Sequence, residues 1–249
     1  MLPEYTTDYL LDKKVKIFQP KNGYRASTDA VLLSAVVKCK KEKSRILDIG
    51  SGTGAISLCL SQRLADKNIE VHGIELQTDL VELSNYSAQQ NNFNFLKFHN
   101  FDLRKKINSE VLKPCSFDIV VSNPPYSDHD MPSPNKSKAT AHNLENFSLS
   151  NWLNFCLKMT KPFGFIYMVN RVEAIPEICY ALNKKAGGLN ILPIYSKEKQ
   201  EAKRVIIFAQ KDSKAPCKIL SPFVVHNENG DYTENAQKIL RLGLSFQDI

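Results

Sequence analysis

One segment, Arg45-Ile-Leu-Asp48-Ile-Gly50-Ser-Gly52-Thr-Gly54, constrains the fold more than any other part of the chain. Its first half is rich in branched apolar residues and predicts a buried strand, which then breaks into a turn with three glycines. After the turn, apolar residues recur with helical spacing at Ile56, Cys59, Leu60 and Leu64. A strand, a glycine-rich turn and a helix in this order indicate the first βα unit of an α/β sheet.

This turn also predicts a nucleotide cofactor. Glycines let a backbone approach a ligand closely, so we expect Asp48, Gly50, Gly52 and Gly54 to line the cofactor site. Because Ala55 follows Gly54, the segment fits the alanine-ending form of the dinucleotide fingerprint. The glycines alone therefore leave both a nicotinamide cofactor and S-adenosylmethionine open.

Two carboxylates follow the next predicted strands. Glu75 ends the strand Glu70–Glu75 and is placed to accept both hydroxyls of a ribose in either class of cofactor. Asp102 follows the strand Phe95–His99 and an aromatic residue, and it can accept from the amino group of an adenine lodged beside that ring. The simpler interpretations are that Glu75 caps the helix near Thr78 and that Asp102 is a solvated loop residue.

The apolar strand Phe117–Ser122 runs directly into Asn123-Pro124-Pro125-Tyr126. Two prolines fix φ near about −65° and remove two backbone donors, so the Asn123 side chain and the Pro124 carbonyl remain as acceptors. Acceptors that grip both hydrogens of a planar amino group favour its pyramidal form, whose lone pair can attack. Tyr126 can stack on the plane that carries the nitrogen. The alternative is that this segment is simply a proline-rich turn after a buried strand. Of the two cofactor classes left open above, the segment favours S-adenosylmethionine, because a nicotinamide-dependent dehydrogenase does not need this sequence.

Ahead of the glycine-rich segment, Ser27, Thr28 and Asp29 precede the apolar run 30–37. Thr28 or Ser27 can cap the helix that this run predicts, with Asp29 favourably placed in the first turn. A helix amino end of this kind also binds carboxylates. We therefore expect Thr28 and Asp29 to contact the methionine end of a cofactor, with simple capping as the alternative.

Together these motifs resemble the class I S-adenosylmethionine-dependent methyltransferases that modify amino nitrogens. The resemblance rests on Asp48–Gly54, Glu75, Asp102 and Asn123–Tyr126, which occur in this order. A narrower resemblance is to the bacterial tRNA (adenine-N6)-methyltransferases that modify the adenine 3′ of the anticodon in a valine tRNA. It is carried by Gly23–Asp29, Lys203–Phe208 and Gly230–Glu234. It implies a doubly wound, Rossmann-like sheet of seven strands that ends in an antiparallel hairpin, with S-adenosylmethionine as cofactor and tRNA as partner.

The second half fits this fold. It predicts a helix over Leu149–Met159, a turn at Pro162–Gly164 and a strand over Phe165–Val169. The segments Leu189–Tyr195 and Arg204–Ala209 predict the antiparallel pair that closes the sheet.

With 249 residues, 43% of them hydrophobic, the chain is long enough for one α/β domain and little more. We expect an irregular, flexible segment over 1–44 that folds across the cofactor, and a catalytic core over 45–249. The six cysteines are scattered, so they suggest neither a metal site nor disulfides and favour the cytoplasm. No signal peptide or transmembrane stretch is apparent, and a monomer is favoured.

A formal charge of +7 favours a polyanionic partner. Ser127–Lys138 is a polar loop long enough to act as a lid over the reacting base. The side chains that we expect to contact RNA are Lys13, Lys136, Lys138, His142, Lys203 and Arg204.

Three other functions remain open. Glutamine N5-methyltransferases of release factors use the same Asn-Pro-Pro-Tyr turn, but they usually carry a helical domain before the glycine-rich strand, where this chain has 44 residues. In RNA guanine N2-methyltransferases a phenylalanine commonly replaces Tyr126. A catalytically inactive RNA-binding module is disfavoured by the intact Asn123.

Overall fold

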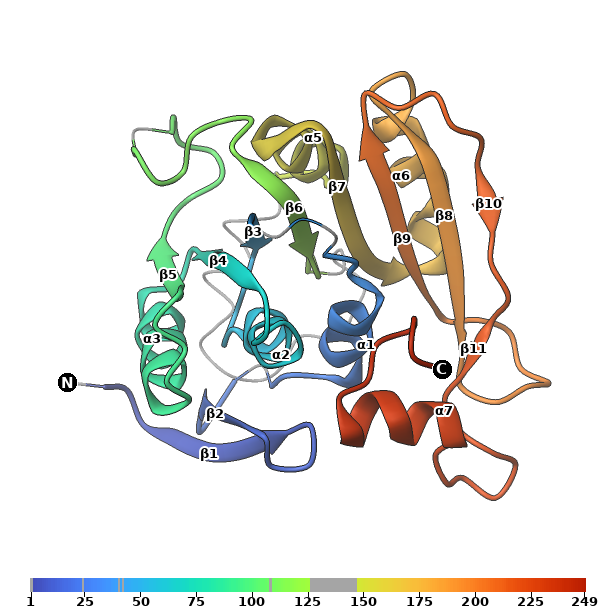
Figure 1. The fold of residues 1–249 in the computed structure, drawn as a ribbon, viewed down its shortest axis with the longest axis horizontal. Helices are drawn as coiled ribbons and strands as arrows, with labels where there is room; N and C mark the ends of the chain where they lie inside the picture. The colour runs from blue at the N-terminus through green and yellow to red at the C-terminus, as the bar shows by residue number, and fades with distance from the viewer. Residues whose placement is uncertain (1, 24, 40, 42, 108, 126–146) are drawn as a thin grey trace.

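A nine-stranded mixed sheet forms the centre of the molecule (Figure 1). The computed structural model describes residues 2–23, 25–39, 41, 43–107, 109–125 and 147–249. The strand order is β10-β8-β9-β7-β6-β3-β4-β5, with β11 beside β8. The strands are β3 (Lys43–Ile49), β4 (Asn68–Glu75), β5 (Leu96–Asn100), β6 (Phe117–Ser122), β7 (Thr160–Arg171), β8 (Ala186–Tyr195), β9 (Arg204–Lys211), β10 (Lys218–Ile219) and β11 (Phe223–Val224).

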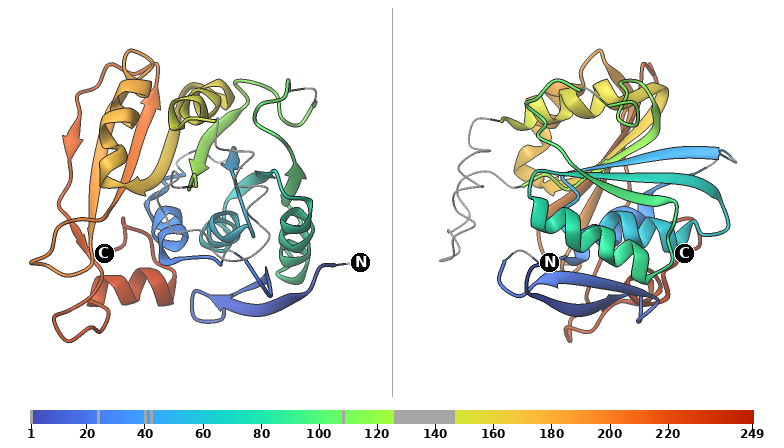
Figure 2. Two further views of the ribbon diagram at one scale, coloured as in Figure 1. Left: turned by 180° about the vertical axis from the view of Figure 1, so that it is seen from behind. Right: turned by 90° about the vertical axis from the view of Figure 1, so that its left-hand side faces the viewer.

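Helices cover both faces of this sheet (Figure 2). They are α1 (Thr28–Val36), α2 (Ala55–Arg63), α3 (Thr78–Gln90), α5 (Leu149–Met159), α6 (Ile175–Leu182) and α7 (Glu234–Gln237), with short helical turns η1 (Val172–Ala174) and η2 (Lys238–Leu242). Successive strand residues point to opposite faces: Ile46 packs with α1 and α2, and Leu47 packs with α5 and α6. The predicted doubly wound α/β class is therefore confirmed.

The carboxyl ends of the parallel strands meet at one edge. Strand β3 pairs in parallel with both β4 and β6, and β6 pairs in parallel with β7. Ile49 lies opposite Ile74 on one side and Ser122 on the other. The glycine-rich turn after Ile49 and the Asn123 turn after Ser122 thus leave adjacent strands at the same edge, where open α/β sheets bind ligands.

Seven strands of the sheet, β3 to β9, correspond to the predicted seven-stranded sheet, and β8 and β9 form the predicted antiparallel pair. The two further strands, β10 and β11, form because the chain returns along the free side of β8 and pairs with it in parallel. The expected turn at 162–164 lies inside β7. There Phe163 adopts a φ of 59° and the register with β6 shifts, so the chain kinks without leaving the sheet.

The start of the chain is an ordered hairpin, not the irregular segment predicted. Strands β1 (Tyr5–Leu10) and β2 (Val15–Pro20) pair antiparallel. Val15 and Ile17 are fully buried, and β2 contacts α2 and α3. The Phe18 amide donates to Ser87 Oγ of α3 at 3.0 Å. Alternating β-branched residues gave this strand a buried face that the surrounding lysines concealed.

Within the described part of the chain, no helix is long and apolar enough to cross a membrane. The same residues contain no cluster of three or more histidine, cysteine or carboxylate side chains suited to a metal ion.

Candidate active site

The glycine-rich turn is fastened to the end of β4. The amides of Gly50 and Ser51 both donate to the Ile74 carbonyl, at 2.9 and 3.0 Å. Gly52 has a φ of +55°, and a Cβ built on it meets no atom within 4 Å. The turn therefore presents open space at Gly52, which a bound ligand can use, and its left-handed backbone favours glycine.

Trp152 joins the glycine-rich turn to the Asn123 turn. A Cβ on Gly50 would lie 2.7 Å from the Trp152 ring, so the indole packs directly on that glycine. The indole Nε1 donates to Ser122 Oγ at 2.8 Å, and Ser122 Oγ donates to the Ile49 carbonyl at 2.7 Å. Trp152 is 5% exposed and Ser122 is fully buried. One buried side chain thus fixes the ends of β3 and β6 relative to each other.

Sequence reasoning missed both of these residues. Ser122 is the one hydroxyl in an otherwise apolar strand end, and Trp152 is the single tryptophan of the chain. A buried hydroxyl needs a partner and a buried indole N–H needs an acceptor, so these two features were the available signal.

Glu75 lies at the end of β4 with its carboxylate turned to the glycine-rich turn. Its Oε2 accepts from the Gly52 amide at 3.0 Å, and its Oε1 accepts from the Gln77 amide at 2.9 Å. Because Gln77 is the N-cap residue of α3, Glu75 does bond the helix start, as the simpler interpretation held. Each oxygen keeps a second lone pair for a ribose hydroxyl.

Asp48 is fully buried at the end of β3. Ser57 Oγ of α2 donates to its Oδ2 at 2.8 Å, while its Oδ1 is buried without a hydrogen-bond partner among the described residues. Burial raises the pKa of the Asp48 carboxyl to about 7. A buried oxygen without a partner is rare in folded proteins, and a bound cofactor is one group that could supply the partner.

Asp102 carries an ion pair that the sequence did not suggest. Its two carboxylate oxygens accept from Arg104 Nε at 2.8 Å and Nη2 at 2.7 Å. These hydrogen bonds hold the pKa of Asp102 below its usual range. The carboxylate stays ionised and oriented, so contact with an adenine amino group remains a prediction that uses the other lone pairs.

The Asn123 turn begins at the carboxyl end of β6, with Asn123 half-buried, Pro124 buried and Pro125 exposed. Tyr126 and the predicted lid with Lys136, Lys138 and His142 lie outside the described residues.

Of the two residues predicted to cap α1, Ser27 occupies the N-cap position, but its side chain makes no capping hydrogen bond. Thr28 is exposed. Asp29 accepts from Arg204 Nε at 3.2 Å, which links the helix to the first residue of β9. Arg204 is therefore held by a carboxylate instead of extending freely toward RNA, while Lys203 beside it is exposed.

Lys13 lies at the tip of the β1–β2 hairpin and lines a pocket with Ser27 and Thr28. Since Asp29 follows Thr28 and pairs with Arg204, the structure brings Lys13 and Arg204 to the same helix end. The sequence could not show that both basic residues lie around the amino end of α1.

These features fit S-adenosylmethionine. The Glu75 side chain offers acceptors for ribose hydroxyls, the backbone leaves open space at Gly52, and Asp48 Oδ1 lacks a partner among the described residues. Glycines that let the backbone come close to the ligand, and a carboxylate at the end of the following strand, are typical of nucleoside cofactor sites.

Comparison with known proteins gives the same picture. Residues 40–210 match the family described as methyltransferase domain. The chain is 30% identical over 200 residues to a tRNA1(Val) (adenine(37)-N6)-methyltransferase of Pedobacter heparinus, covering 78% of this chain and 81% of that protein. It is 24% identical over 236 residues to the protein of the same name from Cytophaga hutchinsonii, covering 92% and 94%.

A solved structure shares the fold. The crystal structure of a predicted O-methyltransferase from Agrobacterium tumefaciens superposes with a TM-score of 0.72 at 22% identity, covering 88% of this chain and 98% of that one. At this identity the likeness concerns the fold alone.

Proposed function

Because this chain belongs to the methyltransferase domain family, and within it to the tRNA1(Val) (adenine(37)-N6)-methyltransferases, we propose that it methylates the N6 amino group of an adenine in tRNA. The target is the adenine next to the anticodon of tRNA(Val). The methyl donor is S-adenosylmethionine, whose sulfonium supplies an electrophilic methyl group when it is bound.

The observation that carries this proposal is the shared anchor of the two turns. Through Trp152, Ser122 and the Ile49 carbonyl, the Asn123 turn is held beside the glycine-rich turn. A nucleophile gripped at Asn123 is therefore adjacent to the cofactor turn, and proximity of this kind is a large part of catalysis.

Asn123 and Pro124 perform the chemical step in this proposal. The Asn123 amide oxygen and the Pro124 carbonyl accept the two hydrogens of the adenine amino group, which favours the pyramidal nitrogen needed for attack. This nitrogen would form a bond to the methyl carbon of bound S-adenosylmethionine as the carbon–sulfur bond breaks, and it would then release one proton to solvent. No general base is required, and Tyr126 stacks on the adenine ring.

RNA binding draws on the basic residues near the start of α1. Lys13 and Lys203 supply phosphate contacts, and Arg204 adds a third while Asp29 orients it. Lys136, Lys138 and His142 would add contacts from the lid. We propose that residues 1–249 act as one methyltransferase domain, as a monomer in the cytoplasm.

The test is mass spectrometry of products after incubation with labelled S-adenosylmethionine and three acceptors: total tRNA, ribosomal RNA and a release factor. We expect the label as N6-methyladenosine in tRNA. Label on glutamine or as N2-methylguanosine, without N6-methyladenosine in tRNA, would contradict the substrate while leaving methyl transfer intact.

A further inference from the structure

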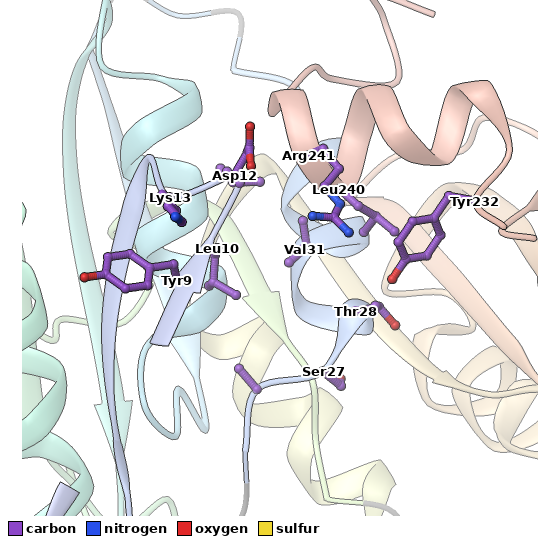
Figure 3. Close-up of a pocket in the computed structure, with 12 residues that line it drawn as sticks. Tyr9, Leu10, Asp12, Lys13, Ser27, Thr28, Val31, Tyr232, Leu240 and Arg241 are labelled. Atoms are coloured by element: carbon purple, nitrogen blue, oxygen red, sulfur yellow. The ribbon is translucent and has the colours of Figure 1, made fainter. Parts of the chain in front are cut away.

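A pocket of about 370 Å³ lies beside the amino end of α1 (Figure 3). It is formed by the tip of the β1–β2 hairpin, the first residues of α1, and the C-terminal segment with η2. None of the glycine-rich turn or the Asn123 turn lines it. Its volume falls in the range of about 300 to 1,000 Å³ that is typical of ligand sites. We call it the α1 pocket.

Basic groups face each other across the α1 pocket. Lys13 and Arg241 lie on opposite sides of it, with the apolar side chains of Leu10 and Val31 between them and Leu240 beside Tyr232 (Figure 3). Asp12 is the one carboxylate among the lining residues. The lining therefore combines an excess of positive charge with an apolar floor, which suits an anion attached to a flat organic group.

The Gly230–Glu234 segment, which the active site does not use, builds one wall of this pocket. The Asn227 amide donates to the Asp231 carbonyl at 2.8 Å, and this turn returns the chain so that Tyr232 bridges to His226. The two rings stack with centroids 5.1 Å apart. The Arg241 guanidinium lies over the Tyr232 ring at 5.9 Å. The stacked tyrosine thereby holds Arg241 in place at the pocket wall.

A second observation points to a ligand with hydrogen-bonding groups. Ser27 lines the pocket, and its Oγ is buried and has no hydrogen-bond partner among the described residues. Thr28 beside it is exposed. Buried hydroxyls are nearly always satisfied, so a ligand that brings hydroxyl or amide groups to Ser27 would complete the site.

The α1 pocket adjoins the edge where the methylated base is expected. Thr28 precedes Asp29, which pairs with Arg204, and Arg204 lies opposite Arg171 at the carboxyl end of β7. Strand β9 is two positions from β6 in the sheet, which is about 10 Å at the usual strand spacing. An RNA that places a base at Asn123 can therefore reach this helix end with a neighbouring nucleotide.

We propose that the α1 pocket binds one nucleotide of the tRNA next to the methylated adenine. Arg241 and Lys13 hold its phosphate, the Ser27 hydroxyl bonds its ribose or base, and the apolar side chains that line the pocket pack against the base. This assignment rests on the proposed function, since it gives the RNA substrate a second point of attachment.

The test is the salt dependence of binding, measured by fluorescence anisotropy with an anticodon stem–loop RNA of tRNA(Val). Each phosphate contact contributes about 0.7 to 0.9 to the slope of log K against log salt. Arg241→Gln and Lys13→Gln should each weaken binding and lower the slope by about 0.7. Lys113→Gln is the matched control, because Lys113 is exposed and precedes β6, at the opposite end of the strand from Asn123.

Affinity for S-adenosylmethionine and the melting temperature should stay at wild-type values in all three variants, which shows that they fold. Wild-type slopes in both Arg241→Gln and Lys13→Gln would overturn the pocket assignment, even if the wild-type protein forms N6-methyladenosine in tRNA. Failure of the wild type to methylate any tRNA adenine would instead overturn the proposed function.

A free mononucleotide carries the same phosphate, ribose and base as a nucleotide of tRNA, so it is the alternative ligand for the α1 pocket. Calorimetry with AMP should show no binding at micromolar concentrations. Micromolar binding of AMP that Arg241→Gln abolishes would assign the pocket to a small nucleotide and overturn the RNA assignment.

Discussion

The indole Nε1 of Trp152 donates to Ser122 Oγ across 2.8 Å, and the same ring packs on the glycine that opens the cofactor turn. Ser122, which precedes Asn123, and Gly50, which opens the glycine-rich turn, therefore share one buried neighbour. In the proposed function, this buried contact fixes how far the amino group held at Asn123 lies from the methyl donor.

Trp152→Phe tests that relationship. The variant keeps an aromatic ring beside Gly50 but removes the N–H that bonds Ser122, a loss of about 0.5 to 1.5 kcal/mol in the free energy of unfolding. We expect kcat to fall by about ten-fold, with the affinity for S-adenosylmethionine nearly unchanged. Urea unfolding and single-turnover kinetics separate the two effects, and an unchanged kcat would show that the anchor does not position the reaction.

Gly50→Ala and Gly52→Ala form a matched pair, since both glycines have a left-handed backbone, with φ of +71° and +55°. The backbone strain of about 1 kcal/mol is common to both variants. Only Gly50→Ala adds a clash, at 2.7 Å from the Trp152 ring, so it should melt at a clearly lower temperature than Gly52→Ala. Gly52→Ala should instead weaken S-adenosylmethionine binding. Equal melting temperatures would contradict the packing described here.

Glu75→Ala should weaken S-adenosylmethionine binding by about 1 to 3 kcal/mol, because buried hydrogen-bonding groups lose their acceptor. The structure adds that the Gly52 and Gln77 amides also lose a partner. Calorimetry measures the effect, with Glu177→Ala on α6 as a control carboxylate outside the cofactor turn. Unchanged affinity in both Glu75→Ala and Asp102→Ala, or tight binding of NADH, would remove the cofactor assignment.

Asp48 predicts a specific pH dependence. Its carboxyl pKa rises from 3.8 in the unfolded chain to about 7 in the buried native site, so folding takes up a proton between these values. The free energy of unfolding should therefore fall as pH rises from about 4 to about 7 and then level off. Asp48→Asn cannot ionise and should lack this contribution.

The measurement for Asp48 is urea unfolding of both proteins at pH 5 and pH 8, without cofactor. The wild type should lose more stability between these two conditions than Asp48→Asn does. The same loss in both proteins would mean that Asp48 does not titrate in this window.

Much of the fold could be predicted from the sequence because, in the central strands, the pattern of apolar residues and the turn-forming residues that follow it indicate the same structure. The residues before Gly50 and those before Asn123 are mostly apolar, and each run is followed by glycines or prolines. This combination predicts a buried strand that ends in a tight turn. The β1–β2 hairpin was not predicted because the buried strand β2 is short and is preceded by Lys13 and Lys14, so its sequence looked like a polar, irregular segment. Strands β10 and β11 are two residues each and have no pattern of their own; they form only because β8 offers a free edge.

The candidate site was predicted residue by residue, but its contacts were not. Glu75 and Asp48 were placed by their positions at the carboxyl ends of predicted strands, which the sequence shows. The pairings of Asp102 with Arg104 and of Asp29 with Arg204 depend on side-chain direction and on strands that meet only in the fold. The α1 pocket joins residues from both ends of the chain, so no local pattern could reveal it.

The central claim is that Asn123 activates an amino nitrogen, and single-turnover methylation of tRNA(Val) by Asn123→Ala tests it most directly. At saturating tRNA and S-adenosylmethionine, the rate of N6-methyladenosine formation should fall by about 10² or more, since the lost interaction strengthens in the transition state. The affinity for S-adenosylmethionine, measured by calorimetry on the same sample, should remain close to wild type. A methylation rate within a few-fold of wild type would contradict the account.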